Sequence, residues 1–415
     1  MGTLALHLTL TALMLGVWAL SSRTPHDSGR WILGAGLAAR ALLFFVPAFT
    51  THDVRRYLWD GRVALAGLDP YRVAADSALA AALQPAWAVA PEHAAYVTLY
   101  PPGAIALFAA CAAFGPTLAF WAWKAVVTAA ALGALGLAVR MLEERCASRH
   151  LALVALSPLL VLESGIGAHL DALSTFAVVA GLLFAGRRRP IATGAVLGLG
   201  GLIKFLPLVL LLPLAAKETR IFSVKMISTA VAVMAVGYGG ALAMGLQPVG
   251  SLAEFFLRWR FGSPGFSVLK SVVGSEHAVA LSLLVALAAV VGLSLVRSAH
   301  ASDVLGASLL TSPILFPWYL TPLVPAIAIA PSAVWLVWTL AAPLTYEVLD
   351  VFDTRGDWSP RAWPLWAIGI GAVLGLAVDC GRWITARSNS NNGSPESKGR
   401  PSVPPHNPDR EDEGR

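Results

Sequence analysis

The sequence has few charged residues, and this deficit excludes most soluble folds. Asp, Glu, Lys and Arg make up only 13% of the 415 residues, while 57% are hydrophobic. Soluble domains carry about 25% charged residues. The charges cluster between apolar runs of roughly 18 or more residues, the length that crosses a bilayer. Because backbone polar groups in lipid must be satisfied internally, each run is expected to form a helix.

The chain also lacks features that mark other classes of protein. Its three cysteines are scattered in or beside apolar runs, without the spacing of a metal site or a disulfide framework. It has no nucleotide-binding glycine loop and no internal repeat. The net charge of +6 comes from basic loops between apolar runs, so nucleic acid is not an expected partner. Residues 3–20 resemble a signal peptide in length, but they lack a positive n-region and a cleavage site, so a retained helix is predicted.

The apolar runs predict an all-α, polytopic transmembrane helical bundle of about 10–12 spans at ~20 residues each. Run 191–215 contains Gly200, Gly201, Lys204 and Pro207 and is predicted to form two half-helices. Run 318–346 is expected to break near Pro331. Run 101–115 is short and is a candidate re-entrant segment. Residues 1–385 are predicted to be one transmembrane domain. Residues 386–415, rich in Ser, Asn, Pro and charge, predict a disordered cytoplasmic tail.

Basic residues in short loops predict the orientation of the spans. Five basic stretches are assigned to the cytoplasm: Arg23 with Arg30, Arg140 to Arg149, Arg187 to Arg189, Lys217 to Lys225, and Arg297. Loops 50–100, 246–277 and 347–362 then lie outside, together with the N-terminus. The protein is therefore expected in the inner (plasma) membrane, with residues 51–100 as its first external loop.

The stretch 51–62 carries the most informative pattern. At about 100° per residue, Asp53, Arg56, Tyr57 and Asp60 fall on one helix face. A carboxylate can take the proton from an acceptor hydroxyl, and arginine binds a leaving phosphate with parallel charge-assisted hydrogen bonds. The set fits glycosyl transfer. An amphipathic interfacial helix whose charges simply face water would show the same pattern.

Other polar residues stand in apolar surroundings, where ionisable groups are costly and usually functional. They are Glu163, His169 and Asp171 between two spans, Lys204 inside a long apolar run, and Trp259 and Arg260 in loop 246–277. Each also has a simpler interpretation: an ordinary external loop, a lysine snorkelling to the interface, or contacts with lipid headgroups. None has zinc-site spacing, and no metal is predicted.

Short motifs continue along residues 50 to 346. They are Asp-x-x-x-Tyr and Trp-Asp-Gly within Asp53 to Gly61, Gly67 to Tyr71, Tyr100-Pro101-Pro102, Lys124, Ser157-Pro158, Glu163, His169-x-Asp171, Lys204-x-x-Pro207, Trp259, and Pro317-Trp318-Tyr319. In this order they resemble the GT-C superfamily of membrane glycosyltransferases. They look closest to the bacterial polyprenyl-phosphate-sugar-dependent group that includes the family 87 mannosyltransferases.

The resemblance implies a GT-C fold with its active site on the first external loop, facing the periplasm. It implies a polyprenyl-phosphate sugar donor, often the mannose form, a lipid or glycan acceptor, and inversion at the anomeric carbon. The acidic residue that starts the loop in that family is the catalytic base, which here is Asp53. Relatives often show two adjacent acids, and this chain has His52 in place of the first. His52 shares the base role, orients the acceptor, or marks a changed function.

Together these inferences predict Asp53, Asp60 and His52 as catalytic residues. Arg56, Lys204 or Arg260 would neutralise the phosphate, while Tyr57, Glu163, His169, Asp171 and Trp259 would bind substrate or support the base. No cofactor and no metal are expected, because a phosphate monoester needs less charge neutralisation than a diphosphate.

Two other functions fit the sequence. A secondary transporter or flippase would use Lys204, Glu163 and Asp171 as substrate or proton sites, although the lack of repeat symmetry disfavours it. A noncatalytic scaffold in the bacterial cell envelope would explain His52.

Overall fold

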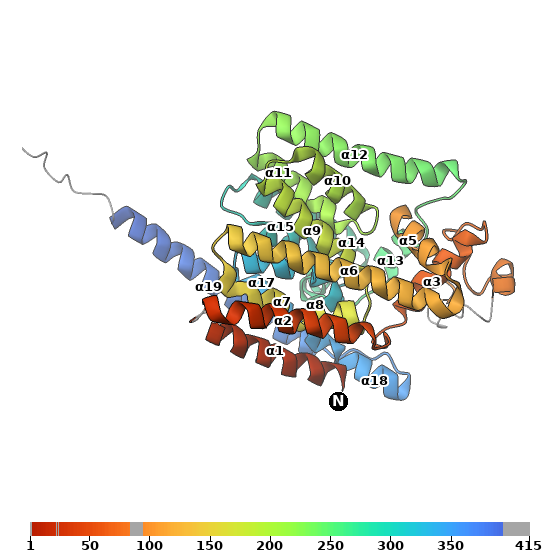
Figure 1. Cartoon of the computed structure of the whole chain (residues 1–415), viewed down its shortest axis with the longest axis horizontal. Coiled ribbons are helices and arrows are strands. Elements are labelled where there is room, and N and C mark those ends of the chain that lie inside the picture. The colour runs from red at the N-terminus through yellow and green to blue at the C-terminus, as the bar shows by residue number, and fades with distance from the viewer. Residues whose placement is uncertain (1, 22, 24, 84–93, 393–415) are drawn as a thin grey trace, which may run out of the picture.

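The computed structural model describes residues 2–21, 23, 25–83 and 94–392. Helices account for most of this part of the chain, and the one backbone bridge within it pairs Phe261 with Ile314. The prediction of an all-α fold is therefore confirmed (Figure 1).

Six stretches of the described residues are long and apolar enough to cross a membrane. They are α1 (Thr3–Ser21), α6 (Gly115–Glu144), α12 (Arg220–Ala243), α14 (Pro264–Leu295), the Ala333–Phe352 stretch, and Trp363–Thr385 of α19 (Trp363–Asn392). The Ala333–Phe352 stretch comprises α17 (Ala333–Ala341), η5 (Ala342–Tyr346) and most of α18 (Glu347–Arg355). The polytopic membrane architecture is confirmed. The helix α19 continues past the predicted start of the tail at residue 386, and residues 393–415 lie outside the described part.

Other helices complete the described part of the bundle. They are α2 (Pro25–Phe44), α3 (Asp53–Leu65), η1 (Ala78–Leu83), α5 (Pro102–Ala112), η2 (Ser148–His150), α7 (Leu151–Ala155), α8 (Pro158–Gly165), α9 (Asp171–Gly186), α10 (Pro190–Gly201), η3 (Leu206–Leu210), α11 (Leu211–Lys217), α13 (Leu252–Arg258), α15 (Ala301–Leu310), η4 (Pro317–Leu320) and α16 (Leu323–Ile329).

Both predicted breaks occur. The run 191–215 divides into α10 and the η3–α11 pair, and the chain between α16 and α17 turns around Pro331. A third break was not predicted: α7 and α8 are separated at Ser157-Pro158. Proline has no N–H to donate and disfavours helical backbone in the residue before it, so this apolar run cannot continue as one helix.

Buried cations satisfy the carbonyls that such breaks expose. The Arg40 guanidinium on α2 donates to the carbonyls of Gly36, Ala155 and Val154 at 2.8–3.2 Å, the last two at the end of α7. Lys124 on α6 donates in the same way to the carbonyl of Leu43 in the last turn of α2 and to that of Val46 just after the helix. Unpaired carbonyls in lipid are unfavourable by several kcal/mol each. Lys124 therefore has a structural role.

The loops separate into two groups at opposite ends of the bundle. The basic loops meet one another: Arg187 pairs with Glu144 at 2.6 Å, and Arg188 lies 3.5 Å from Glu218. Lys217 reaches the Ala299 carbonyl.

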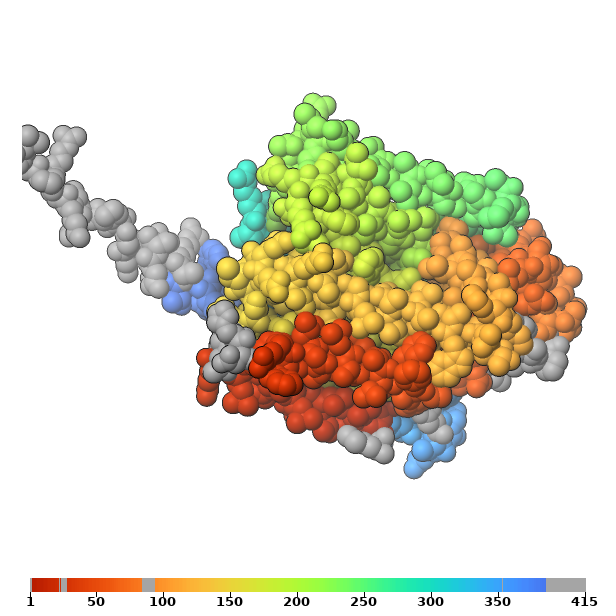
Figure 2. Space-filling model, in the orientation of Figure 1, coloured from red at the N-terminus to blue at the C-terminus, as the bar shows by residue number. Residues whose placement is uncertain are grey.

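At the other end, the backbone N–H of Gln247 donates to the Asp69 carboxylate, and the backbone N–H of Thr3 donates to the Asp350 carboxylate. Figure 1 shows α3, α5, α13 and α18 gathered at this end, where the N-terminus also lies. The space-filling view shows α2, α6 and α12 forming much of one lateral face (Figure 2).

Candidate active site

Helix α3 packs closely against α5 at Gly61. A Cβ on Gly61 would lie 2.3 Å from the Phe108 carbonyl carbon and oxygen, a distance that real Cβ contacts do not show. The close approach explains the Trp-Asp-Gly motif physically, since only glycine lets the two backbones touch. Most of α3 is buried, and Arg56, Tyr57 and Asp60, which the helical periodicity places on one face, are among its buried residues.

Asp53 is the first residue of α3, where the helix dipole stabilises a negative charge. Its Oδ2 accepts a hydrogen bond from the Tyr57 hydroxyl at 3.3 Å and lies 3.3 Å from Nδ1 of His169. Its side chain is 22% exposed. The carboxylate is thus held by two neighbours while remaining open on one side.

Tyr57 is fixed in an aromatic cluster. Its ring stacks on Phe108 at 4.8 Å and meets Tyr100 and Trp123 edge-on. Burial raises the pKa of Tyr57, and the charge of Asp53 raises it further. The phenol therefore stays protonated and acts as a donor toward Asp53.

His169 lies directly behind Asp53, in the loop between α8 and α9. Its ring is fully buried, stacks on Trp318 at 4.0 Å, and has its Nε2 3.4 Å from Glu163. Burial alone lowers the pKa of His169, but the hydrogen bond with Asp53 and the surrounding carboxylates outweigh it and raise the pKa above its ordinary value. His169 and Glu163 therefore support Asp53 from behind, and neither lines the large cavity described below.

Lys204 stands in the break between α10 and η3. Its Nζ lies 2.6 Å from the buried carboxylate of Asp171 and 3.6 Å from the centre of the Tyr319 ring. The Lys204 side chain is 23% exposed. The break in the helix thus presents a cation that a second ligand can reach.

The other predicted cations are differently engaged. Arg56 pairs with Asp60 at 2.9 Å in a largely buried contact. The Arg260 guanidinium donates to the carbonyls of Phe256, Leu257 and Trp259, closing the end of α13. Its donors are therefore directed at its own backbone.

A cavity of about 760 Å³ connects these groups. Its lining includes eight of the predicted site residues: His52, Asp53, Arg56, Tyr57, Asp171, Lys204, Trp259 and Arg260. Three predicted residues lie behind the wall and not on it: Asp60, Glu163 and His169. The volume is in the range of about 300–1,000 Å³ typical of ligand sites.

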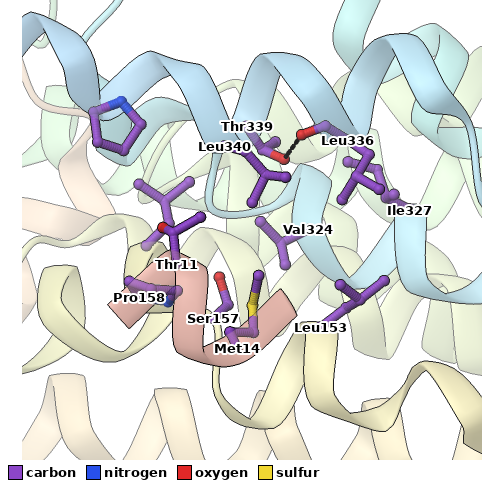
Figure 3. A pocket seen from close by; sticks show the side chains of 12 residues that line it. Thr11, Met14, Leu153, Ser157, Pro158, Val324, Ile327, Leu336, Thr339 and Leu340 are labelled. Atoms are coloured by element: carbon purple, nitrogen blue, oxygen red, sulfur yellow. Dashed lines mark hydrogen bonds between the residues drawn. The ribbon is translucent and has the colours of Figure 1, made fainter. Parts of the chain in front are cut away.

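A second opening is much smaller (Figure 3). It measures about 20 Å³, lies between α1, the α7–α8 break, α16 and α17, and shares no lining residue with the large cavity. Such a void holds about one water molecule. It is a packing feature around Ser157-Pro158 and not a substrate site.

Sequence reasoning missed two polar residues of this region. The Tyr346 hydroxyl donates to Glu163 at 2.5 Å, and His7 Nε2 lies 3.3 Å from the same carboxylate oxygen. His7 carried a signal, because it is the one ionisable side chain in the apolar helix α1. Tyr346 carried none, since it stands at the end of an apolar run, where an interfacial tyrosine is ordinary.

Within the described residues, no group of three or more His, Cys, Asp or Glu side chains has the arrangement of a metal site. The candidate site instead consists of a carboxylate, a lysine and aromatic rings around one cavity at the end of a helical membrane bundle.

Such a bundle and site define the class of polytopic membrane glycosyltransferases with a GT-C-like fold. The chain belongs to the family described as alpha-(1->6)-mannopyranosyltransferase, N-terminal domain, whose model matches residues 1–220, a little over half of its length. The matched part contains Asp53, Glu163, His169, Asp171 and Lys204. Curated proteins and solved structures contain no match to this chain.

Proposed function

We propose that this protein transfers mannose from a polyprenyl-phosphate donor to a hydroxyl of a lipid or glycan acceptor, with inversion at the anomeric carbon. The observation that carries the proposal is the single cavity lined by both Asp53 and Lys204. The family description supplies the sugar. A base and a phosphate-binding cation sharing one space are what an in-line displacement at the anomeric carbon requires.

Asp53 is the general base. It removes the proton from the acceptor hydroxyl as the oxygen attacks the anomeric carbon. The hydrogen bond from Tyr57 and the contact with His169 fix the orientation of the carboxylate before substrate binds. Its partial exposure toward the cavity leaves room for the acceptor oxygen.

Lys204 is the cation that receives the leaving phosphate. Arg260 directs its donors to backbone carbonyls, and Arg56 is engaged with Asp60. Lys204 has one carboxylate partner, retains exposed surface in the cavity, and has three donors to share. A charge-assisted hydrogen bond from Lys204 stabilises the negative charge that develops on the departing phosphate.

The donor's prenyl chain lies along the apolar part of the same cavity. Side chains from η3, α14 and α15 form this part: Leu206, Val209, Leu283, Ala286 and Leu309. A lipid chain there places its phosphate near Lys204, at the depth where the helix breaks.

The test is transfer from radiolabelled polyprenyl-phosphate mannose by the full-length protein in nanodiscs, with a lipid extract as acceptor. Asp53→Asn is expected to lower kcat by about 100- to 10,000-fold, the usual contribution of general acid–base catalysis. Asp76→Asn is the control, since Asp76 is an exposed acid in the same loop and does not line the cavity. Near-normal transfer by Asp53→Asn removes Asp53 as base. Transport of donor lipid in proteoliposomes without a covalent product points to a transporter instead.

We place the active site on the extracytoplasmic side because the basic loops collect at the opposite end of the bundle. Cys146 is exposed and lies in one of those basic loops. In a Cys380→Ser background, a membrane-impermeant maleimide is expected to label Cys146 only after the cells are permeabilised. Labelling in intact cells would reverse the orientation.

A further inference from the structure

A chain of buried polar side chains begins at Asp53 and runs away from the cavity. His169 stands between two carboxylates, with Nδ1 3.3 Å from Asp53 and Nε2 3.4 Å from Glu163. Each ring nitrogen therefore lies within ion-pair distance of a carboxylate oxygen, although neither forms a hydrogen bond of regular geometry. A neutral imidazole donates from one nitrogen only, whereas an imidazolium donates from both.

The His169 ring is held in this orientation from two sides. Trp318 stacks on it at 4.0 Å with an interplanar angle of 10°. Gly167 leaves the space that the pair needs, since a Cβ there would lie 2.6 Å from His169 Cδ2 and 2.9 Å from Glu163 Oε2. The geometry of the His169–Glu163 contact is thus determined by the packing around it.

Glu163 is in turn held by two residues from distant parts of the chain. Its Oε1 accepts a hydrogen bond from Tyr346 at the end of η5 and lies 3.3 Å from Nε2 of His7 on α1. The other ring nitrogen of His7 lies 3.1 Å from the Thr3 carbonyl. A proton on that nitrogen would be donated to this carbonyl. No part of the transfer reaction itself requires α1, so these contacts need another explanation.

Other titratable groups surround the chain. Asp171, paired with Lys204, acts on His169, and Tyr57 and Tyr100 act on Asp53. Arg40 shares with Glu163 the lining of a void of about 20 Å³. None of these groups bridges Glu163 to His169. Their electrostatic effect on Asp53 is therefore expected to be the same in each of the variants compared below.

We propose that His7 and Tyr346 are positioning residues that hold Glu163 against His169, so that His169 stays charged beside Asp53 and keeps the base ionised. The proposal rests on the function proposed above, in which Asp53 is the base. It gives the first membrane helix a part in the reaction, although His7 contributes nothing to the cavity lining.

The acid limb of the pH profile of kcat/KM measures the ionisation of the base in the free enzyme. It is therefore sensitive to any buried side chain that changes the charge beside Asp53. An opposite charge within about 4–6 Å lowers the pKa of a carboxyl group by about one to three units. His169→Gln removes that charge and is expected to move the acid limb upward by about one to three pH units. Tyr346→Phe, Glu163→Gln and His7→Gln are each expected to move it upward by less.

The decisive comparison combines these changes. Because Tyr346, Glu163 and His7 act through His169, none of their substitutions is expected to move the limb further in a His169→Gln background. Tyr71→Phe is the matched control, since it also loses one tyrosine hydrogen bond, to the Tyr100 carbonyl, without touching Glu163. Its acid limb is expected to stay in place.

Two results would overturn the inference. One is an unchanged acid limb in both Tyr346→Phe and His7→Gln. The other is a shift that remains equally large in the His169→Gln background. If His7→Gln does not fold, Tyr346→Phe alone decides, because it keeps the aromatic ring. Transfer that survives Asp53→Asn overturns the proposed function and this inference together. Loss of transfer in Asp53→Asn with an unchanged Tyr346→Phe profile overturns this inference alone.

Discussion

Replacing Lys204 by methionine tests whether this residue binds the leaving phosphate. Methionine keeps most of the side-chain volume and removes the charge. If Lys204 binds the leaving phosphate, its loss removes a hydrogen bond between charged groups, which contributes about 1.5–3 kcal/mol. Donor kcat/KM is then expected to fall by about 10- to 100-fold, at 1.4 kcal/mol for each factor of ten.

The same substitution also affects stability. The Asp171 carboxylate is 1% exposed, and its partner Nζ at 2.6 Å is lost. Removing one member of a buried ion pair destabilises a protein by about 3–5 kcal/mol, because the remaining charge is buried without compensation. Lys204→Met should therefore lower the unfolding temperature in detergent as well as the activity.

The double variant Lys204→Met with Asp171→Asn resolves the ambiguity. The neutral amide removes the uncompensated charge, so stability is expected to recover toward that of Asp171→Asn alone. Activity is not expected to recover, because the phosphate still lacks its cation. The assay is initial-rate transfer over a range of donor concentrations, together with thermal unfolding of the same preparations. Equal kcat/KM in the double variant and in Asp171→Asn alone would refute the reasoning and leave Lys204 as a partner of Asp171 only.

Two further predictions concern folding. Gly61→Ala is expected to lower the unfolding free energy by about 1–3 kcal/mol, as overpacking does, because its Cβ would meet the Phe108 carbonyl at 2.3 Å. Gly136→Ala on α6, where a Cβ would meet nothing within 4 Å, is the control and should be neutral or stabilising in thermal unfolding. Folding raises the pKa of His169. The contribution of protonated His169 to the free energy of unfolding is therefore complete below about pH 6.5, the ordinary pKa of histidine. That contribution is lost as pH rises through the folded-state pKa, so wild type should lose stability over this range and His169→Gln should not. An identical pH dependence in both proteins would contradict the assignment.

The fold class and the position of Asp53 at the start of a polar helix were accessible from sequence. Apolar runs of bilayer length depend only on composition over some twenty residues. The breaks before Pro207 and around Pro331 follow from local backbone chemistry. The shared face of Asp53, Arg56, Tyr57 and Asp60 follows from helical periodicity alone. The break at Ser157-Pro158 was missed although its signal was equally local.

Other features of the site depend on contacts across the whole chain. The sequence left Arg56, Lys204 and Arg260 equivalent as phosphate ligands. The structure distinguishes them, because Arg260 is directed to backbone carbonyls and Arg56 to Asp60.

What the sequence alone determined is therefore a membrane bundle of helices, with a polar helix carrying a carboxylate at its first turn. Only the tertiary structure decided which polar groups surround that carboxylate. Helical periodicity specifies which residues share a face of one helix, but the partner of that face depends on how every helix is rotated and tilted in the packed bundle. For this reason His7, Glu163, His169 and Tyr346, separated by up to 339 positions of sequence, meet in one buried chain behind Asp53.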